Sequence, residues 1–321
     1  MNSFSISQMR TSNSSGLLNF FKGPGSILLS AFLFYMATFM VRIGFDAAEM
    51  PTIVFLSSRF LLGYVLLLVW FRLKRSKASN LKAVNKKWLW YRAVWNLIAV
   101  FFFYLGVIYG TVTGANILNM TYPAFVALFS IWLLTVRLTK TDLAGICLTL
   151  VGVFFISFNG EYYYPEKGDL FGLLSAITAG VAIVALKIIR ETDSTDAILF
   201  YTFRLGAWLT IIPVIIIFWQ TPSYLRWDVL YYSVASAIFG ILGQIFLTFG
   251  YRFVNAVEGS IYSASRLLFA LFMGMLFWQK DIYLQSILGA ILILLANLVF
   301  AFKKTAPKSS GGRIPKYEQA E

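Results

Sequence analysis

The stretch PTIVFLSSRFLLGYVLLLVWF, residues 51–71, is almost wholly apolar but carries one arginine, Arg59, near its middle. A helical run of about 20 apolar residues, rising about 1.5 Å per residue, crosses a hydrocarbon core about 30 Å thick. We therefore predict a membrane-spanning helix here. A guanidinium at that depth costs about 2.5–3.5 kcal/mol on insertion scales, so such residues usually face a cavity, a partner or a substrate.

Runs of this kind fill most of the 321-residue chain. Hydrophobic residues make up 59% of it and charged residues 13%, and the mean hydropathy is +0.74, values that soluble domains of this length do not reach. We predict an all-α integral membrane protein with ten transmembrane helices. Their expected ranges are 26–44, 51–72, 88–109, 111–133, 142–158, 169–189, 197–219, 228–250, 257–278 and 283–302.

The distribution of Lys and Arg predicts the orientation, because these residues accumulate in cytoplasmic loops. The connection after the second span, 71–88, holds seven of them, whereas the loops after spans one, three and five contain only Lys167. The end of the chain is also basic. We therefore expect both termini in the cytoplasm and the protein in the cytoplasmic (inner) membrane. The net charge of +13 follows from this topology, so no nucleic-acid partner is expected.

The chain repeats itself through its first two spans at an offset of 145 residues, which places Arg42 on Lys187 and Arg59 on Arg204. Later spans repeat more loosely at offsets of 143 to 144. Each half then holds five spans, and this odd number inverts the second half, with a binding site expected near the midplane. The predicted units are a polar cytoplasmic segment 1–25, a first five-helix repeat 26–158, a second five-helix repeat 159–302 and a basic cytoplasmic tail 303–321.

The run YPAFVALFSIWLLTVRLTKTDLAGICLTLVGV, residues 122–153, together with the five-plus-five arrangement, resembles the drug/metabolite transporter superfamily in its ten-helix, EamA-type form. The similarity extends from the first predicted span to the last. It implies export of amino acids, metabolites or drugs, as in many members, or exchange of anions, as in others. Tyr122 and Val136 stand where the family often has acidic residues, and Arg266 or Leu267 stands where the second repeat would have proline.

The charged side chains inside the predicted spans are all basic, since none of the fourteen acidic residues lies in a span interior. Arg42, Arg92 and Lys187 lie close enough to a predicted helix end for their side chains to reach the membrane interface. Three other arginines lie about seven to nine residues, or about 10–14 Å, from the nearer end. They are Arg59, Arg204 and Arg266.

These three arginines need a carbonyl, a polar side chain, water or a bound molecule as partner. A planar guanidinium binds two oxygens of a carboxylate or phosphate at once. We therefore predict that they bind an anionic substrate, with Arg59 and Arg204 as a pseudo-symmetric pair; hydrogen bonds that join helices are the structural alternative. The polar residues expected to complete the site are Tyr35, Asn96, Asn119, Tyr122, Tyr201, Gln244, Tyr262 and Ser263.

The residue types present argue against catalysis. The chain has no histidine and a single cysteine, which argues against the common metal sites, general bases and nucleophiles of enzymes. It also has no Walker loop, which argues against ATP-driven transport by this chain. We expect no enzyme activity and no cofactor or metal.

The predicted function is secondary active or facilitative transport of a small anionic or carboxylate-bearing metabolite by alternating access, by a monomer or homodimer in the lipid membrane. The alternatives are an exporter of neutral or amphipathic compounds or amino acids, with structural arginines, and a membrane scaffold or sensor.

Overall fold

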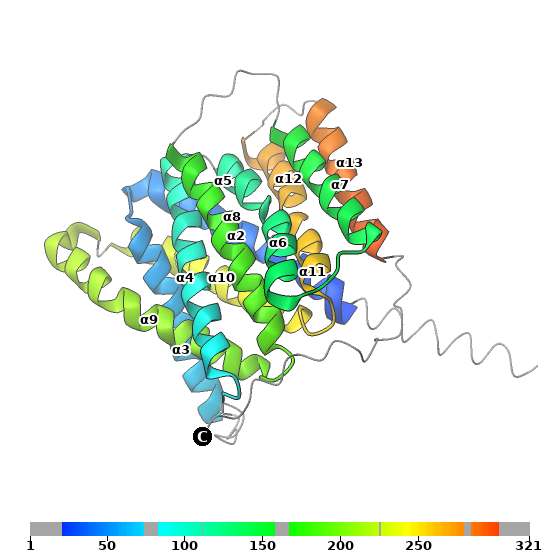
Figure 1. Ribbon diagram of the computed structural model, residues 1–321. Coiled ribbons are helices and arrows are strands. Elements are labelled where there is room, and N and C mark those ends of the chain that lie inside the picture. The colour runs from blue at the N-terminus through cyan, green and yellow to red at the C-terminus, as the bar shows by residue number, and fades with distance from the viewer. Residues whose placement is uncertain are drawn as a thin grey trace, which may run out of the picture.

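The computed structural model describes residues 21–73, 83–110, 112–157, 167–224, 226–278 and 284–301. Within these ranges the chain is helical and contains no strand, which confirms the predicted all-α class. Figure 1 shows the helices packed side by side into one bundle. The predicted cytoplasmic tail and most of the predicted N-terminal segment lie outside the described residues.

Seven stretches of helix are long and apolar enough to cross a membrane: Phe21–Ala47, Thr52–Leu73, Lys86–Tyr109, Gly114–Leu134, Lys167–Ile189, Thr195–Gln220 and Trp227–Gly250. The protein is therefore a multi-pass membrane protein. The count of ten spans stays a prediction.

In chain order the elements are η1 (Phe21–Gly25), α2 (Ser26–Ala48), α3 (Thr52–Leu73), α4 (Lys86–Tyr109), α5 (Val112–Asn119), α6 (Tyr122–Leu134), α7 (Lys140–Ser157), α8 (Lys167–Ile189), α9 (Thr195–Gln220), η3 (Pro222–Tyr224), α10 (Trp227–Gly250), α11 (Ala256–Ala264), α12 (Arg266–Trp278) and α13 (Leu284–Ala301).

Two of the predicted spans, 111–133 and 257–278, are interrupted in the structure. The first is divided into α5 and α6, and Pro123 lies in the first turn of α6, where its missing N–H removes no helical hydrogen bond. The second is divided at Ser265, between α11 and α12, and the Asn297 side-chain amide donates to Ser265 Oγ across 2.6 Å. Both interruptions place helix ends inside the bundle, where polar groups at those ends can face a cavity.

The helices pack mainly as pairs that join the two predicted halves: α2 with α10, α4 with α8, α3 with α9 and α7 with α13. Figure 1 shows α7 and α13 side by side. Glycines allow this last pair to approach closely, since a Cβ on Gly152 would lie 2.8 Å from the carbonyl oxygen of Gly289.

Two of these helix pairs are joined by matching hydrogen bonds. Ser30 Oγ of α2 donates to the carbonyl of Gly243 in α10 (2.8 Å), and Ser175 Oγ of α8 donates to the carbonyl of Ala99 in α4 (2.9 Å). The two serines are 145 residues apart, the offset that the sequence repeat predicts for α2 and α8.

The contact between α3 and α9 is also reciprocal, but at a different offset. Phe60 packs against Gly206, and Phe203 packs against Gly63, where a Cβ would lie 2.6 Å from the ring. Each residue of α3 therefore corresponds to the residue of α9 that lies 143 positions later, instead of 145. The register of the repeat thus shifts by two residues between the first and the second helix of each half.

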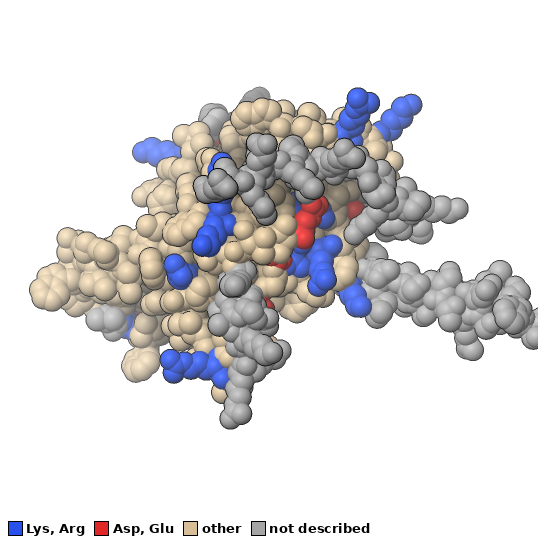
Figure 2. All heavy atoms as spheres, turned by 60° about the horizontal axis from the view of Figure 1, so that its bottom comes forward, with Lys and Arg blue, Asp and Glu red and all other residues tan. Residues whose placement is uncertain are grey.

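The outer surface carries large apolar side chains and few charges. Trp132 and Trp219 are exposed to 77% and 85%, and Ile212 of α9 to 65%, as expected for helix faces that lie against lipid. Figure 2, which brings the bottom of Figure 1 forward, shows scattered basic side chains and a few acidic ones on a mostly uncharged surface.

Candidate functional site

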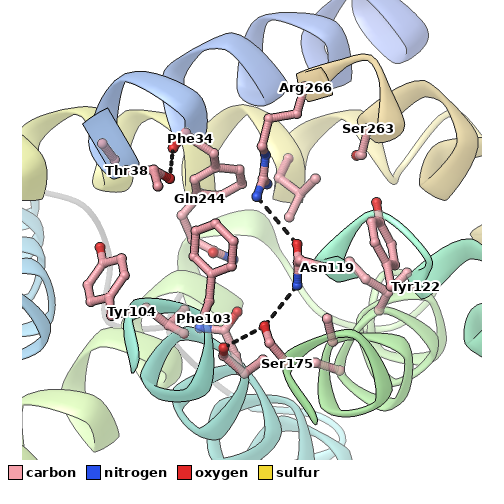
Figure 3. A pocket seen from close by; sticks show the side chains of 18 of the residues that line it. Phe34, Thr38, Phe103, Tyr104, Asn119, Tyr122, Ser175, Gln244, Ser263 and Arg266 are labelled. Carbon is pink, nitrogen blue, oxygen red and sulfur yellow. Dashed lines mark hydrogen bonds between the residues drawn. The ribbon is translucent and has the colours of Figure 1, made fainter. Parts of the chain in front are cut away.

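Helix faces and interrupted helix ends line a small, partly open cavity of about 90 Å³. Its wall carries three arginines: Arg59 of α3, Arg92 of α4 and Arg266 at the start of α12. None of the described residues that line it is acidic. Polar side chains of Asn96, Asn119, Tyr122, Ser175, Gln244 and Ser263 share the wall with apolar ones that include Phe34 and Phe103, as Figure 3 shows for most of them.

Phe34 of α2 lies next to two of the arginines. The Cζ atom of Arg59 is 5.0 Å from the centre of the Phe34 ring, and the Cζ atom of Arg266 is 5.1 Å from it. The Arg266 guanidinium is also 5.6 Å from the ring of Phe103 (Figure 3). Cation–π contacts of this kind contribute about 2 kcal/mol when desolvated. They hold both guanidiniums at the cavity without neutralising their charge.

Two glycines of α10 provide the space for this arrangement. A Cβ on Gly240 would lie 3.0 Å from Arg59 Nε, and one on Gly243 would lie 2.8 Å from the Phe34 ring. Arg59 therefore packs directly against the backbone of α10. At its other end Arg59 Nη1 donates to the hydroxyl of Tyr104 at 3.5 Å, a long bond.

Arg266 begins a chain of hydrogen bonds that crosses the cavity wall (Figure 3). Its Nη1 donates to Asn119 Oδ1 at 3.5 Å, and the Asn119 amide donates to Ser175 Oγ at 2.8 Å. Ser175 then donates to the carbonyl of Ala99. The orientation of Asn119, the last residue of α5, is thereby determined: its oxygen faces Arg266.

Arg92 is the charged residue of the cavity wall that the sequence analysis did not predict, because its side chain was expected at the membrane interface. In the structure it is 1% exposed and lines the cavity. Asn96 lies one turn further along α4 on the same face. Arg92 Nε, Arg92 Nη2 and Asn96 Nδ2 are buried and find no acceptor among the described residues. The pairing of two polar residues at positions i and i+4 of an apolar helix was visible in the sequence and could have identified Arg92.

The other two cations that were expected to reach the interface do lie near helix ends. Arg42 Nε is 3.0 Å from the Asp46 carboxylate and is partly exposed. Lys187 Nζ donates to the carbonyl of Val254 at 3.0 Å. Neither lines the cavity.

Six of the predicted site residues line the cavity together: Arg59, Arg266, Asn96, Asn119, Tyr122 and Gln244. Tyr35, Arg204 and Tyr262 do not. Tyr35 and Tyr262 are each 1% exposed and pack inside the helix bundle. Ser263, also expected at this depth, lines the cavity, and Tyr201 does not.

Arg204 lies among aromatic rings of its own helix. Its Cζ atom is 4.8 Å from the Trp208 ring and 5.6 and 5.7 Å from those of Tyr201 and Phe200. The two-residue shift between α3 and α9 explains this placement, because an offset of 143 places Arg59 on the buried Thr202. Two residues correspond to about 200° around a helix, so Arg204 faces away from that position. The geometry brings Arg59 together with Arg266 and Arg92, and Arg204 lies elsewhere.

Comparison with known proteins identifies similar chains along nearly the whole length. The EamA-like transporter family matches residues 21–158 and 166–302. An uncharacterized transporter of Helicobacter pylori (strain J99) is 28% identical over 285 residues, which cover 87% of this chain and 94% of the relative. The pseudopaline exporter CntI of Pseudomonas aeruginosa is 26% identical over 278 residues, 86% of this chain and 95% of the exporter.

A solved structure described only as the crystal structure of a protein has the same overall arrangement, with a TM-score of 0.65. It is 16% identical, and the match covers 87% of this chain and 97% of the other. At that identity the likeness concerns the fold alone.

Proposed function

This chain belongs to the EamA-like transporter family, and we propose that it moves a small anionic, carboxylate-bearing metabolite across the cytoplasmic membrane by alternating access. Family membership confirms the transporter class predicted from the sequence, and with it the prediction that the chain is not an enzyme. It also implies a small-molecule substrate and a lipid environment.

The observation that carries the proposal is the one-sided charge of the cavity. Three guanidiniums line about 90 Å³ of space, with no acidic residue among the described residues of its wall. A buried cation is costly unless a negative group compensates it. A carboxylate suits arginine because the planar fork donates to both oxygens. A bound anion therefore supplies the compensation that the wall lacks.

The alternating-access mechanism needs two halves that move relative to each other. We propose the ten-span arrangement of two inverted five-helix repeats, 26–158 and 159–302, with both termini in the cytoplasm. The pairing of α2 with α10 and of α4 with α8 through matching serine hydrogen bonds supports this arrangement. The interrupted helices at the cavity support it too, since transporter sites are often built from discontinuous helices near the midplane. An exporter among the relatives favours outward transport.

One observation favours the alternative, in which the cargo is neutral or amphipathic. Arg59 and Arg266 both stack on Phe34, and Arg266 is hydrogen-bonded to Asn119, so the two arginines also join helices. A structural role of this kind would need no anion.

Transport by the purified protein in liposomes separates the two functions. We expect saturable, protein-dependent uptake of at least one small carboxylic acid from a radiolabelled panel, and none of a lipophilic cation. Arg59→Gln should lower this uptake at least about tenfold, as expected for loss of a charge-assisted hydrogen bond. Saturable uptake of neutral or amphipathic compounds that Arg59→Gln leaves unchanged would establish the alternative.

Arg204→Gln is the matched control, because it makes the same chemical change at the position that the sequence repeat pairs with Arg59. Arg204 lies over Trp208 and away from the cavity, so its variant should retain uptake within about twofold of the original. An equal loss in both variants would show that uptake responds to basic charge anywhere in the bundle.

A further inference from the structure

Five hydrogen-bond donors on residues that line the cavity have no acceptor among the described residues. Arg59 Nε, Arg92 Nε and Nη2, Asn96 Nδ2 and Arg266 Nε are all buried without an acceptor among the described residues. Each of these atoms can only donate. Leaving a buried donor unpaired is costly, most of all on a charged group. The donors together call for a ligand rich in acceptor oxygens.

These donors form two groups on different helices. Arg59 and Arg266 lie beside the Phe34 ring, each about 5 Å from its centre. Arg92 and Asn96 share one face of α4. All four residues line the same cavity, so the two groups are neighbours.

The positive charge of the cavity wall favours a substrate with two negative charges over one with a single negative charge. The cavity wall carries three formal positive charges and no negative one among the described residues. A monocarboxylate would neutralise one charge and leave the second group of donors unpaired. Two carboxylates would supply four oxygens, enough for acceptors at both groups.

We propose that the substrate is a small dicarboxylate, with one carboxylate bound by Arg59 and Arg266 and the other by Arg92 and Asn96. The proposal rests on the anion transport proposed above and narrows its substrate class. Arg92 and Asn96 thereby act as specificity-determining residues: they distinguish a second acidic group from an apolar or neutral substrate end.

The test is binding to the purified full-length chain, measured as ligand-induced thermal stabilisation over a concentration series. Succinate, glutarate and adipate are compared with the monocarboxylates of the same chain lengths, butyrate, valerate and hexanoate. We expect at least one dicarboxylate to bind at least about tenfold more tightly than its monocarboxylate partner, the effect of one further charge-assisted contact. Inorganic phosphate, which carries its charge in a single group, should bind no better than the monocarboxylates.

Arg92→Gln should reduce this dicarboxylate preference to near unity, because it weakens binding of the dicarboxylate much more than binding of the monocarboxylate. Asn96→Ala should reduce it in the same direction and provides the test if Arg92→Gln does not fold. Arg42→Gln is the control, since Arg42 is paired with Asp46 outside the cavity and its loss should leave the preference unchanged.

The outcomes separate the two proposals. Equal binding of mono- and dicarboxylates, or of phosphate and dicarboxylates, would overturn the two-carboxylate substrate and leave anion transport standing. Binding of none of these anions, with uptake of neutral compounds, would overturn both. If the preference for dicarboxylates persists in Arg92→Gln and Asn96→Ala, the second carboxylate does not bind at this face of α4.

Discussion

Replacing Gly240 of α10 by alanine tests whether the position of Arg59 determines substrate affinity. The new Cβ would lie 3.0 Å from Arg59 Nε, 3.1 Å from Cδ and 3.2 Å from Cζ. Ordinary contacts between non-bonded carbon atoms are about 3.5–4.0 Å. The guanidinium must therefore move by roughly 0.5 Å away from α10, because the backbone of α10 cannot retreat as easily as the end of a flexible side chain.

The magnitude follows from this displacement. A hydrogen bond to a charged group contributes about 1.5–3 kcal/mol, and a shift of roughly 0.5 Å would forfeit about half of it, so substrate affinity should fall about four- to twelvefold. Stability should change little, since alanine gains about 0.5–1 kcal/mol over glycine inside a helix and the clash is with a movable side chain. Affinity and stability are thus predicted to change separately.

The assay is substrate affinity from counterflow in liposomes, together with the melting temperature of the purified variant. Gly145→Ala in α7 is the matched control, because it makes the same substitution in a helix away from the cavity and should leave affinity unchanged. The double variant Gly240→Ala with Arg59→Gln should bind no more weakly than Arg59→Gln alone, because the two changes act through one side chain. Additive losses in the double variant, or a lower melting temperature with unchanged affinity, would refute the reasoning.

Three further predictions use other parts of the molecule. Asn119→Asp places a carboxylate where an amide oxygen now accepts from Arg266, so it should compete with the substrate and lower its affinity about ten- to a hundredfold in a folded protein, measured by the same counterflow assay. Gly289→Ala should lower the melting temperature without changing affinity, since its Cβ would lie 2.5 Å from the carbonyl oxygen of Gly152 and overpacking of this kind costs about 1–3 kcal/mol. A pH gradient imposed on liposomes without counter-substrate should not drive concentrative uptake, because the chain has no histidine and the described cavity wall has no acidic residue. Accumulation under these conditions would show proton-driven transport and contradict this prediction.

The membrane class and the approximate position of the spans follow from the sequence alone. An apolar run of about 20 residues can satisfy its backbone in lipid only as a helix, whatever its neighbours are. The same local reasoning predicted Arg59 and Arg266 as site residues, because a charge deep in an apolar helix is costly wherever that helix packs, and both line the cavity. It also predicted Asn119 and Tyr122, which line the cavity on either side of the interruption between α5 and α6.

Only the tertiary structure decided which face of each helix meets the cavity. Apart from Arg92 and Asn96 on one face of α4, these helices have few polar residues that line up on one face, so the direction of a face can rarely be inferred from the sequence. Depth alone therefore placed Tyr35 and Tyr262 in the site, although both pack inside the bundle. It also left out Arg92, whose position near a helix end concealed the inward direction of its side chain.

The pairing of Arg59 with Arg204 shows the same limit most clearly. The sequence repeat aligns them at an offset of 145, but the packing of Phe60 and Phe203 on opposite glycines sets the offset between α3 and α9 at 143. From the sequence, positions 202 and 204 of α9 are both plausible partners of Arg59, and the matching arginine favours 204. In space, about 200° of helix rotation separates these two positions, and the contacts between α3 and α9 determine which of them is equivalent to Arg59.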